Sequence, residues 1–204
     1  MKRSDCLDVL ATLVDGEMLT VTSQSGRTGG PWRRINKAAA NFPGLNLGLC
    51  VPFALGMALA FPDRRVFALD SDGSLLLDTS ALITVADANA GNLVILVFDN
   101  QAYARMGPTA TARSADIEKI AQGAGIPSTE TVRSLEAFEA AVRHALASPG
   151  PSVVVAKVET EAERGDSSAT RRNGRSARDV FVENVEALPD HWGTHGRSLT
   201  RGQG

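Results

Sequence analysis

Cysteine is scarce in this sequence of 204 residues, which has only Cys6 and Cys50. Their spacing matches no metal-binding motif, so they predict neither a disulfide framework nor an iron–sulfur cluster. An excess of one charge is also missing, because 21 Lys and Arg residues stand against 23 Asp and Glu residues and leave a formal net charge of −2. With its arginines scattered, the chain gives no electrostatic reason to expect a nucleic-acid partner.

Long hydrophobic runs are missing as well. No run approaches the ~18 apolar residues that a membrane-spanning helix needs. Near the N-terminus, Asp5 and Asp8 stand where a signal peptide would carry apolar residues. We therefore expect no membrane association and a cytoplasmic location.

Apolar runs of strand length alternate with helical patterns along most of the chain. Strands are expected at 18–22, 66–69, 93–98, 129–132 and 152–158. Helices are expected from Ser4 as an N-cap to Asp15, at 49–60 and 77–88, over 114–123 with Ser114 as cap, and at 134–146. Unbroken apolar strands separated by helices are typical of a sheet covered on both faces. The pattern predicts one doubly wound α/β domain with a mainly parallel sheet of about six strands.

The composition changes after residue 158. We expect the α/β domain over 1–158, a polar linker over 159–175, a C-terminal helix over 176–188 and a disordered tail over 189–204. Phe181, Val185 and Leu188 have the spacing of one apolar helix face. His191 and His195 have the spacing of a helical metal pair, but Gly193 between them favours the tail instead.

Oxygen-bearing side chains follow two of the expected strands. Asp72 lies in an acidic turn after the strand at 66–69, and Asn100 follows the strand at 93–98. A right-handed crossover places the carboxyl ends of parallel strands at one sheet edge, so these side chains can meet. Such oxygens suit Mg²⁺, and the backbone amides of Gly73 and Ser74 at a helix start favour a diphosphate. An ordinary surface loop is the alternative.

The motif Ser71-Asp72-Gly73-Ser74, followed by Asp99-Asn100, resembles the GDG…NN signature of thiamine diphosphate enzymes, with Ser71 and Asp99 at the variable positions. The resemblance implies that thiamine diphosphate and Mg²⁺ are the cofactors. It also implies that Asp72, the Asn100 side chain and the Ala102 carbonyl bind the metal.

Residues 45–48 are similar to a second cofactor-binding segment of that family, which precedes a small-residue helix. The resemblance implies that the Leu45 carbonyl accepts from the cofactor's aminopyrimidine, that Leu47 supports its bent form, and that Gly48 belongs to the same cofactor-binding turn. The Gly-rich loop at 23–31 is either a ligand-binding loop or a mobile connection.

The segment after Asn100 resembles the loop that follows the metal-binding Asn in sulfopyruvate and phosphonopyruvate decarboxylases. The residues that fit its register are Tyr103, Gly107, Pro108, Thr109, Thr111 and Ala112. The resemblance adds Tyr103 to the cofactor-binding residues. Arg105 is either a contact for an anionic substrate or an exposed side chain without a specific role.

The nearest resemblance is to the β subunit of sulfopyruvate decarboxylase and to the C-terminal half of phosphonopyruvate decarboxylase. It implies non-oxidative loss of CO₂ from a small 2-oxoacid, giving an aldehyde. The Glu that contacts the pyrimidine N1′ in this family lies in a separate pyrimidine-binding domain, for which this chain has no room. We therefore expect an α subunit to donate it in a hetero-oligomer, facing residues 49–60 and 101–112, with homodimers when the chain is isolated.

Three other functions remain open. An acetolactate synthase-like carboligase subunit would share the same cofactor motifs, and a non-catalytic homologue would keep the fold and bind cofactor alone. The β chain of a 2-oxoacid:ferredoxin oxidoreductase is disfavoured because the cluster cysteines are missing. The sequence does not identify the substituent on the substrate's third carbon.

Overall fold

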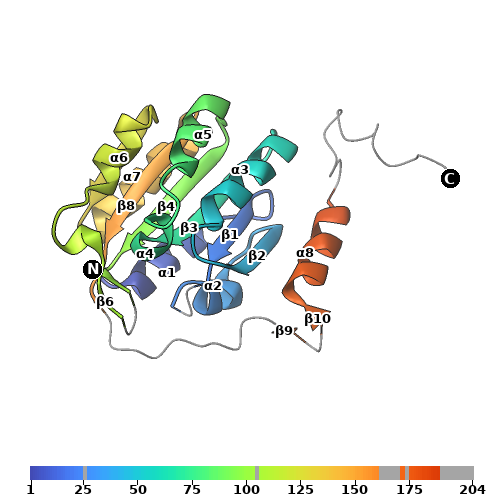
Figure 1. Ribbon diagram of the computed structural model, residues 1–204. Coiled ribbons are helices and arrows are strands. Elements are labelled where there is room, and N and C mark those ends of the chain that lie inside the picture. The colour runs from blue at the N-terminus through green and yellow to red at the C-terminus, as the bar shows by residue number, and fades with distance from the viewer. Residues whose placement is uncertain (25–26, 104–105, 161–170, 173–174, 189–204) are drawn as a thin grey trace.

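The computed structural model describes residues 1–24, 27–103, 106–160, 171–172 and 175–188. Its centre is a six-stranded sheet in which all pairings are parallel (Figure 1). In spatial order the strands are β2 (Ala40–Leu45), β1 (Leu19–Ser23), β3 (Val66–Ser71), β4 (Leu93–Asp99), β8 (Ser152–Lys157) and β7 (Ser128–Val132). From β1 the chain passes to the edge strand β2, returns to β3 and β4, and reaches the other edge at β7 before it ends the sheet with β8, which confirms the predicted doubly wound α/β fold.

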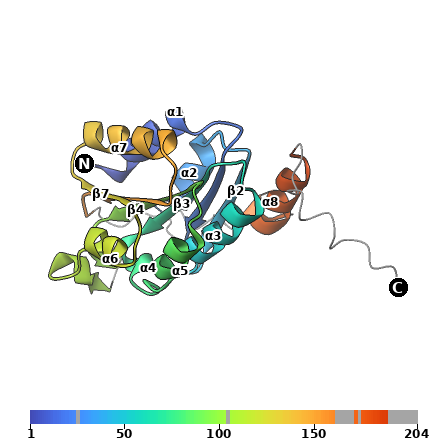
Figure 2. The same cartoon turned by 90° about the horizontal axis from the view of Figure 1, so that it is seen from above.

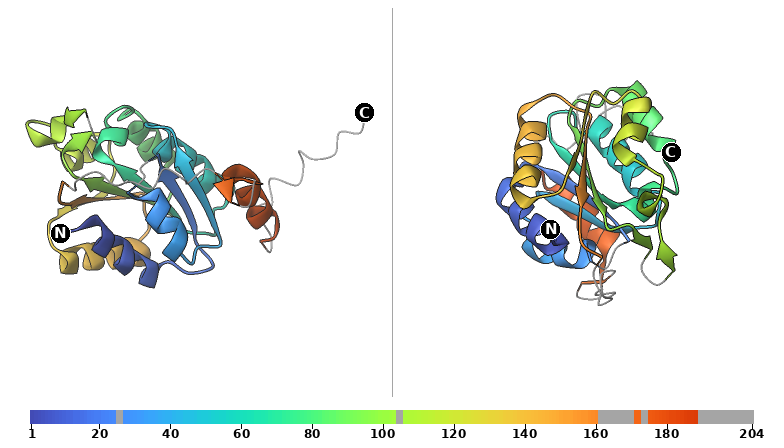
Figure 3. Two further views of the ribbon diagram at one scale, coloured as in Figure 1. Left: turned by 90° about the horizontal axis from the view of Figure 1, so that it is seen from below. Right: turned by 90° about the vertical axis from the view of Figure 1, so that its left-hand side faces the viewer.

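Helices cover both faces of the sheet (Figures 2 and 3). One layer contains α1 (Arg3–Leu13), α2 (Gly29–Ile35) and α7 (Leu135–Ala147). The other contains α3 (Cys50–Ala60), α4 (Asp72–Leu75), α5 (Ala81–Ala88) and α6 (Ile117–Gly123). Alternate residues of each strand enter different cores, since Ile95 packs toward the α3 layer and Leu96 toward the α1 layer. In the part of the chain that the structure describes, no helix has the length and apolar character needed to cross a membrane.

Two predicted helix starts were wrong, because neither predicted serine caps its helix. Helix α1 already begins at Arg3, and the Ser4 hydroxyl donates to Asp5 instead of capping. Helix α6 begins after Asp116, whose carboxylate accepts from the Lys119 amide at 3.2 Å, so Ser114 is not its cap. The predicted cap Ser134 is confirmed by its 3.2 Å bond from the Ala137 amide.

The crossover between β3 and β4 contains two helices, where one was predicted over 77–88. The short α4 begins at Asp72 because the Ser71 hydroxyl caps it and accepts from the Ser74 amide. Helix α5 begins only at Ala81. Asp72 is therefore part of a helical turn whose start is fixed by its neighbour.

Helix α2 and strand β2 both lie in stretches that were expected to be loops. Strand β2 contains Pro43 and Gly44, which argue against a strand in the sequence. Because β2 is an edge strand, proline can occupy a position that a central strand would not allow.

A further helix, α8 (Ala177–Glu186), lies within the segment expected to be helical. Its Phe181 and Val185 are buried against the core, and the Phe181 ring packs edge-on to that of Phe42 with 5.0 Å between centroids. Before it, β9 (Arg171–Arg172) and β10 (Arg175–Ser176) form a two-residue ladder. Most of the predicted linker, and the predicted tail with His191 and His195, lie outside the described residues.

Candidate functional site

Asp72 and Asn100 meet at the carboxyl edge of the sheet. Strands β3 and β4 are neighbours in register, with Ser71 opposite Phe98, so the residues that follow them leave the sheet at the same place. Both side chains are buried, and the Asn100 amide approaches Asp72 Oδ1 at 3.1 Å. The crossover geometry thus brings together the two side chains as the sequence predicts.

The Asn100 side-chain amide has two possible orientations. With its nitrogen turned inward it donates to the Ala102 carbonyl at 3.0 Å and to Asp72 Oδ1 at 3.1 Å. With its oxygen turned inward, three oxygens from these residues face one another with no hydrogen between them. A carboxylate, an amide and a carbonyl oxygen are the donors that a hard divalent cation prefers. The residues therefore fit Mg²⁺, which would require the second orientation.

Two threonines fix the carboxylate of Asp72 from the other side. Thr109 Oγ1 donates to Asp72 Oδ2 at 2.6 Å, and Thr111 Oγ1 lies 3.2 Å from the same oxygen. This leaves Oδ1 facing Asn100. Burial raises the pKa of Asp72 above its ordinary value, and the bond from Thr109 opposes that rise. A cation beside Oδ1 would favour the charged carboxylate in the same way.

Gly73 allows the ring of Tyr103 to lie against the start of α4. A Cβ atom on Gly73 would come within 2.6 Å of Tyr103 Cε1 and 2.7 Å of Cδ1. Tyr103 belongs to a small antiparallel hairpin of β5 (Ala102–Tyr103) and β6 (Gly107–Pro108), where the sequence predicted only a loop. Arg105 lies outside the described residues.

The segment 45–48 also reaches this edge. The Gly48 amide donates to the Ser74 hydroxyl at 3.1 Å, which ties the segment to α4. The Leu47 side chain is 39% exposed beside it. The Leu45 carbonyl already accepts from the Gln24 amide at 2.6 Å, and its second lone pair remains for a further donor. The cofactor contacts of these three residues stay predictions.

A second buried carboxylate, Asp70, lies just before the site. Its Oδ1 accepts from the Ser71 amide at 2.9 Å. Burial raises the pKa of Asp70 to about 6. Cys50 lies close by, and its thiol is buried between the carbonyls of Val21 and Leu69 at 3.7 Å. Cys50 is therefore part of the hydrophobic core.

Sequence reasoning missed an ion pair between Asp99 and Lys157. Asp99 is 1% exposed, and its Oδ2 binds the ammonium of Lys157, whose side chain is 19% exposed. Asp99 Oδ1 accepts from Thr111 Oγ1 at 2.8 Å. The sequence does carry a signal for this pair, because each of two apolar strands ends in a charged residue, Asp99 in β4 and Lys157 in β8.

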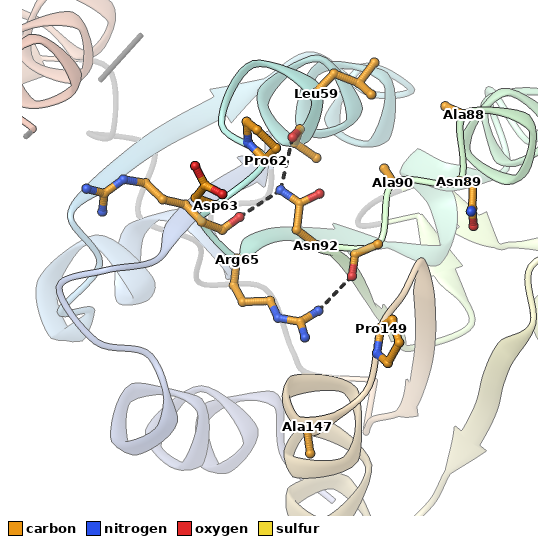
Figure 4. A pocket seen from close by; sticks show the side chains of 13 residues that line it. Leu59, Pro62, Asp63, Arg65, Ala88, Asn89, Ala90, Asn92, Ala147 and Pro149 are labelled. Atoms are coloured by element: carbon orange, nitrogen blue, oxygen red, sulfur yellow. Dashed lines mark hydrogen bonds between the residues drawn. The ribbon is translucent and has the colours of Figure 1, made fainter. Parts of the chain in front are cut away.

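A hollow of about 610 Å³ lies at the opposite edge of the sheet, before β3 and β4 (Figure 4). Arg65 and Asn92 in its wall connect loops through backbone carbonyls. The acceptors are Gly91, Leu146 and Ser148 for Arg65, and Ala58, Phe61 and Arg64 for Asn92. Because both side chains bond to the protein itself, we assign them a structural role and place the candidate site at the Asp72 edge.

Comparison with known proteins agrees with this geometry. A family model described as "Thiamine pyrophosphate enzyme, C-terminal TPP binding domain" matches residues 25–156. The chain is 32% identical over 156 residues to the β subunit of sulfopyruvate decarboxylase from Methanocaldococcus jannaschii, covering 74% of this chain and 82% of that subunit. It is 37% identical over 109 residues to phosphonopyruvate decarboxylase from Streptomyces viridochromogenes, covering 53% of this chain and 27% of that protein.

Solved structures share the fold. Benzoylformate decarboxylase from Polynucleobacter necessarius superposes with a TM-score of 0.68 at 20% identity, covering 80% of this chain and 34% of that one. The thiamine diphosphate-dependent 4-hydroxybenzoylformate decarboxylase from Rhodococcus jostii gives 0.65 at 21% identity, covering 80% and 33%. The chain thus spans about a third of each of these structures.

Proposed function

Because this chain belongs to the thiamine pyrophosphate enzymes, through their C-terminal cofactor-binding domain, we propose that it is the β subunit of a thiamine diphosphate- and Mg²⁺-dependent 2-oxoacid decarboxylase. The observation that carries this proposal is the match to a sulfopyruvate decarboxylase β subunit over 82% of its length. The Asp72 site supports it, because its oxygens suit the cation that accompanies a diphosphate. The proposed reaction is non-oxidative loss of CO₂ from a 3-substituted pyruvate, in the cytoplasm.

In this proposal Asp72, Asn100 and the Ala102 carbonyl hold Mg²⁺, and residues 1–158 form the diphosphate-binding unit. Bound thiamine diphosphate supplies a nucleophilic carbanion and an electron sink for the leaving carboxylate's electrons. The chain's own residues position it. Gly73 and Ser74 offer backbone amides beside Ser71 and the metal ligands.

The other proposed cofactor contacts enclose the site. Gly48 ties the 45–48 segment to α4, the Leu45 carbonyl accepts from the Gln24 amide at its other end, and Leu47 presents an apolar side chain. Tyr103 packs its ring over Gly73. Together these residues would limit the access of water to the bound group.

An α subunit completes the site in this proposal by donating the Glu that contacts the pyrimidine ring. An exposed apolar surface supports the expectation of a partner. Leu49, Leu77, Ile83 and Met106 are 48–80% exposed, on segments that surround the Asp72 edge. A Cβ on Gly48 would lie 3.5 Å from Leu77 Cβ, which shows how closely the first two segments approach. An apolar patch formed by such side chains would mark an interaction surface.

The test is to purify the full chain alone and with the polypeptide encoded beside it, and to supply thiamine diphosphate and Mg²⁺. We expect release of CO₂ and an aldehyde from 3-sulfopyruvate or 3-phosphonopyruvate only when both chains are present. Activity of the isolated chain would refute the need for an α subunit. Acetolactate formed from pyruvate would favour a carboligase, and failure of the complex to bind the cofactor in calorimetry would favour a non-catalytic homologue.

A further inference from the structure

The Asp99–Lys157 ion pair lies directly behind the candidate metal ligands. Asp99 and Lys157 end two neighbouring parallel strands and are opposite each other in register. They also share a face of the sheet, because they continue the rows of Val97 and Val155, which pack toward the α3 layer. A carboxylate that is 1% exposed is costly without such a partner. Lys157 therefore explains how a charge can be kept at position 99.

One oxygen of Asp99 accepts hydrogen bonds from two residues that lie next to candidate metal ligands. Its Oδ1 accepts from Thr111 Oγ1 at 2.8 Å and from the Gln101 amide at 3.1 Å. Thr111 is in contact with Asp72, and Gln101 directly precedes Ala102. Gln101 has a φ of +61°, a left-handed conformation that a side chain rarely adopts without support. The bond from its amide to Asp99 supplies that support and turns the chain so that the Ala102 carbonyl faces the Asn100 side chain.

The hydroxyl protons of the two threonines can be assigned from the distances. Thr111 has one proton and three possible acceptors, which are Asp99 Oδ1 and Thr109 Oγ1 at 2.8 Å and Asp72 Oδ2 at 3.2 Å. Of the two nearer acceptors the charged carboxylate is the stronger, which assigns this proton to Asp99. Thr109 then donates to Asp72 Oδ2 at 2.6 Å, and Asp72 Oδ1 remains directed at Asn100 and Ala102.

We propose that Asp99, neutralised by Lys157, is a positioning residue that orients Asp72 and the Ala102 carbonyl toward the metal ion. The inference rests on the proposed function, because it takes these groups as Mg²⁺ ligands. Asp99 acts through Thr111 and through the turn at Gln101. Thr111 reaches Asp72 by way of Thr109, because the two hydroxyl oxygens lie 2.8 Å apart and Thr109 donates to Asp72. Lys157 fixes the second oxygen of Asp99, so that the first one keeps both donors.

The test measures Mn²⁺ affinity by electron paramagnetic resonance in the two-chain complex with thiamine diphosphate, Mn²⁺ replacing Mg²⁺. Asp99→Ala should raise the Kd for Mn²⁺ about 10-fold or more, as the loss of a group supporting a metal ligand does. Thr111→Val, which removes only the hydroxyl, should shift the Kd in the same direction. The matched control is Arg143→Met, which breaks the exposed pair with Glu139 and should leave the Kd unchanged.

The variant Lys157→Met distinguishes a positioning role of the ion pair from a direct effect of its charge on Mn²⁺ affinity. Removing a positive charge near the metal would by itself tighten Mn²⁺ binding, whereas a carboxylate that has lost its partner no longer holds Thr111 and Gln101 in place, and binding weakens. The double variant Asp99→Asn with Lys157→Met keeps an acceptor without an unpaired charge. We expect it to return to within about threefold of the wild-type Kd.

Three results would overturn the inference. Tighter Mn²⁺ binding by Lys157→Met would mean that the pair acts only through charge. A lower melting temperature with an unchanged Kd in Asp99→Ala and Asp99→Asn would mean that the pair only stabilises the fold. A wild-type complex that binds thiamine diphosphate but no Mn²⁺ would refute the metal site and this inference with it, leaving the fold assignment intact.

Discussion

Replacing Gly73 by alanine tests the contact on which the geometry of the candidate site depends. The new Cβ would lie 2.6 Å from Tyr103 Cε1, with Thr109 Cγ2 at 3.6 Å. Carbon atoms normally pack at about 3.5–4.0 Å, so the tyrosine ring has to move by roughly 1 Å. Because Tyr103 follows Ala102 in the same short strand, this movement also displaces the Ala102 carbonyl from the Asn100 side chain, which it approaches at 3.0 Å.

The expected cost has two parts. Overpacking at a buried position costs about 1–3 kcal/mol of folding free energy, which for a chain of this size lowers Tm by about 2–4 °C per kcal/mol. Displacing a metal ligand should raise the Kd for Mn²⁺ by about 10-fold or more. Differential scanning fluorimetry of the isolated chain measures the first effect, and paramagnetic resonance of the complex measures the second.

A second-site variant makes the reasoning falsifiable. Adding Tyr103→Ala to Gly73→Ala removes the clash and should restore most of the lost Tm. A Gly73→Ala chain with unchanged Tm and unchanged Mn²⁺ affinity would show that the ring moves without cost. In that case the close packing of Tyr103 on Gly73 would have no functional meaning.

The remaining predictions concern groups around the site. Burial raises the pKa of the Cys6 thiol to about 12 and that of the Cys50 thiol well above its ordinary value, so iodoacetamide at about pH 8 should label neither in the native chain and both in urea; rapid native labelling would contradict this. Burial raises the pKa of Asp70 from 3.8 to about 6, so in the metal-free chain the folded state binds more protons between these values and stability falls as pH rises, by at most about 1.4 kcal/mol per pH unit. Asp70→Asn should flatten this part of the urea-unfolding profile, and an unaltered slope would assign the effect elsewhere. Asn92→Ala removes three bonds to carbonyls at the opposite edge and should cost about 2–3 kcal/mol of stability with no change in cofactor affinity, whereas a weaker affinity would place a function at that edge.

The parts of the fold that were predictable are those fixed by local pattern. Strands β3, β4 and β8 are unbroken apolar runs because both of their faces are buried, and their predicted limits differ from the structure by one or two residues. Strand β2 was missed because at an edge the chain tolerates Pro43 and Gly44, which in a sequence indicate a turn. The apolar pattern of a sequence therefore predicts which strands are buried better than it predicts which segments pair as strands.

The candidate site also has a part that the sequence predicts and a part that it does not. The meeting of Asp72 and Asn100 follows from the handedness of one crossover, which any such sequence must obey. The bonds from Thr109 to Asp72 and from Lys157 to Asp99 join residues 37 and 58 positions apart. These contacts depend on how a loop folds back and on which strands become neighbours, and no periodicity in the sequence encodes either.

The packing of α8 on the edge of the sheet has a consequence for truncation. The Phe181 ring covers those of Phe42 and Phe53, and α8 packs along β2, the last strand at that edge. A chain cut at residue 160 would retain every proposed ligand atom but would bare these rings and an unpaired strand. Such an edge invites self-association, so a shortened protein that precipitates would not by itself mean that the cofactor site has failed.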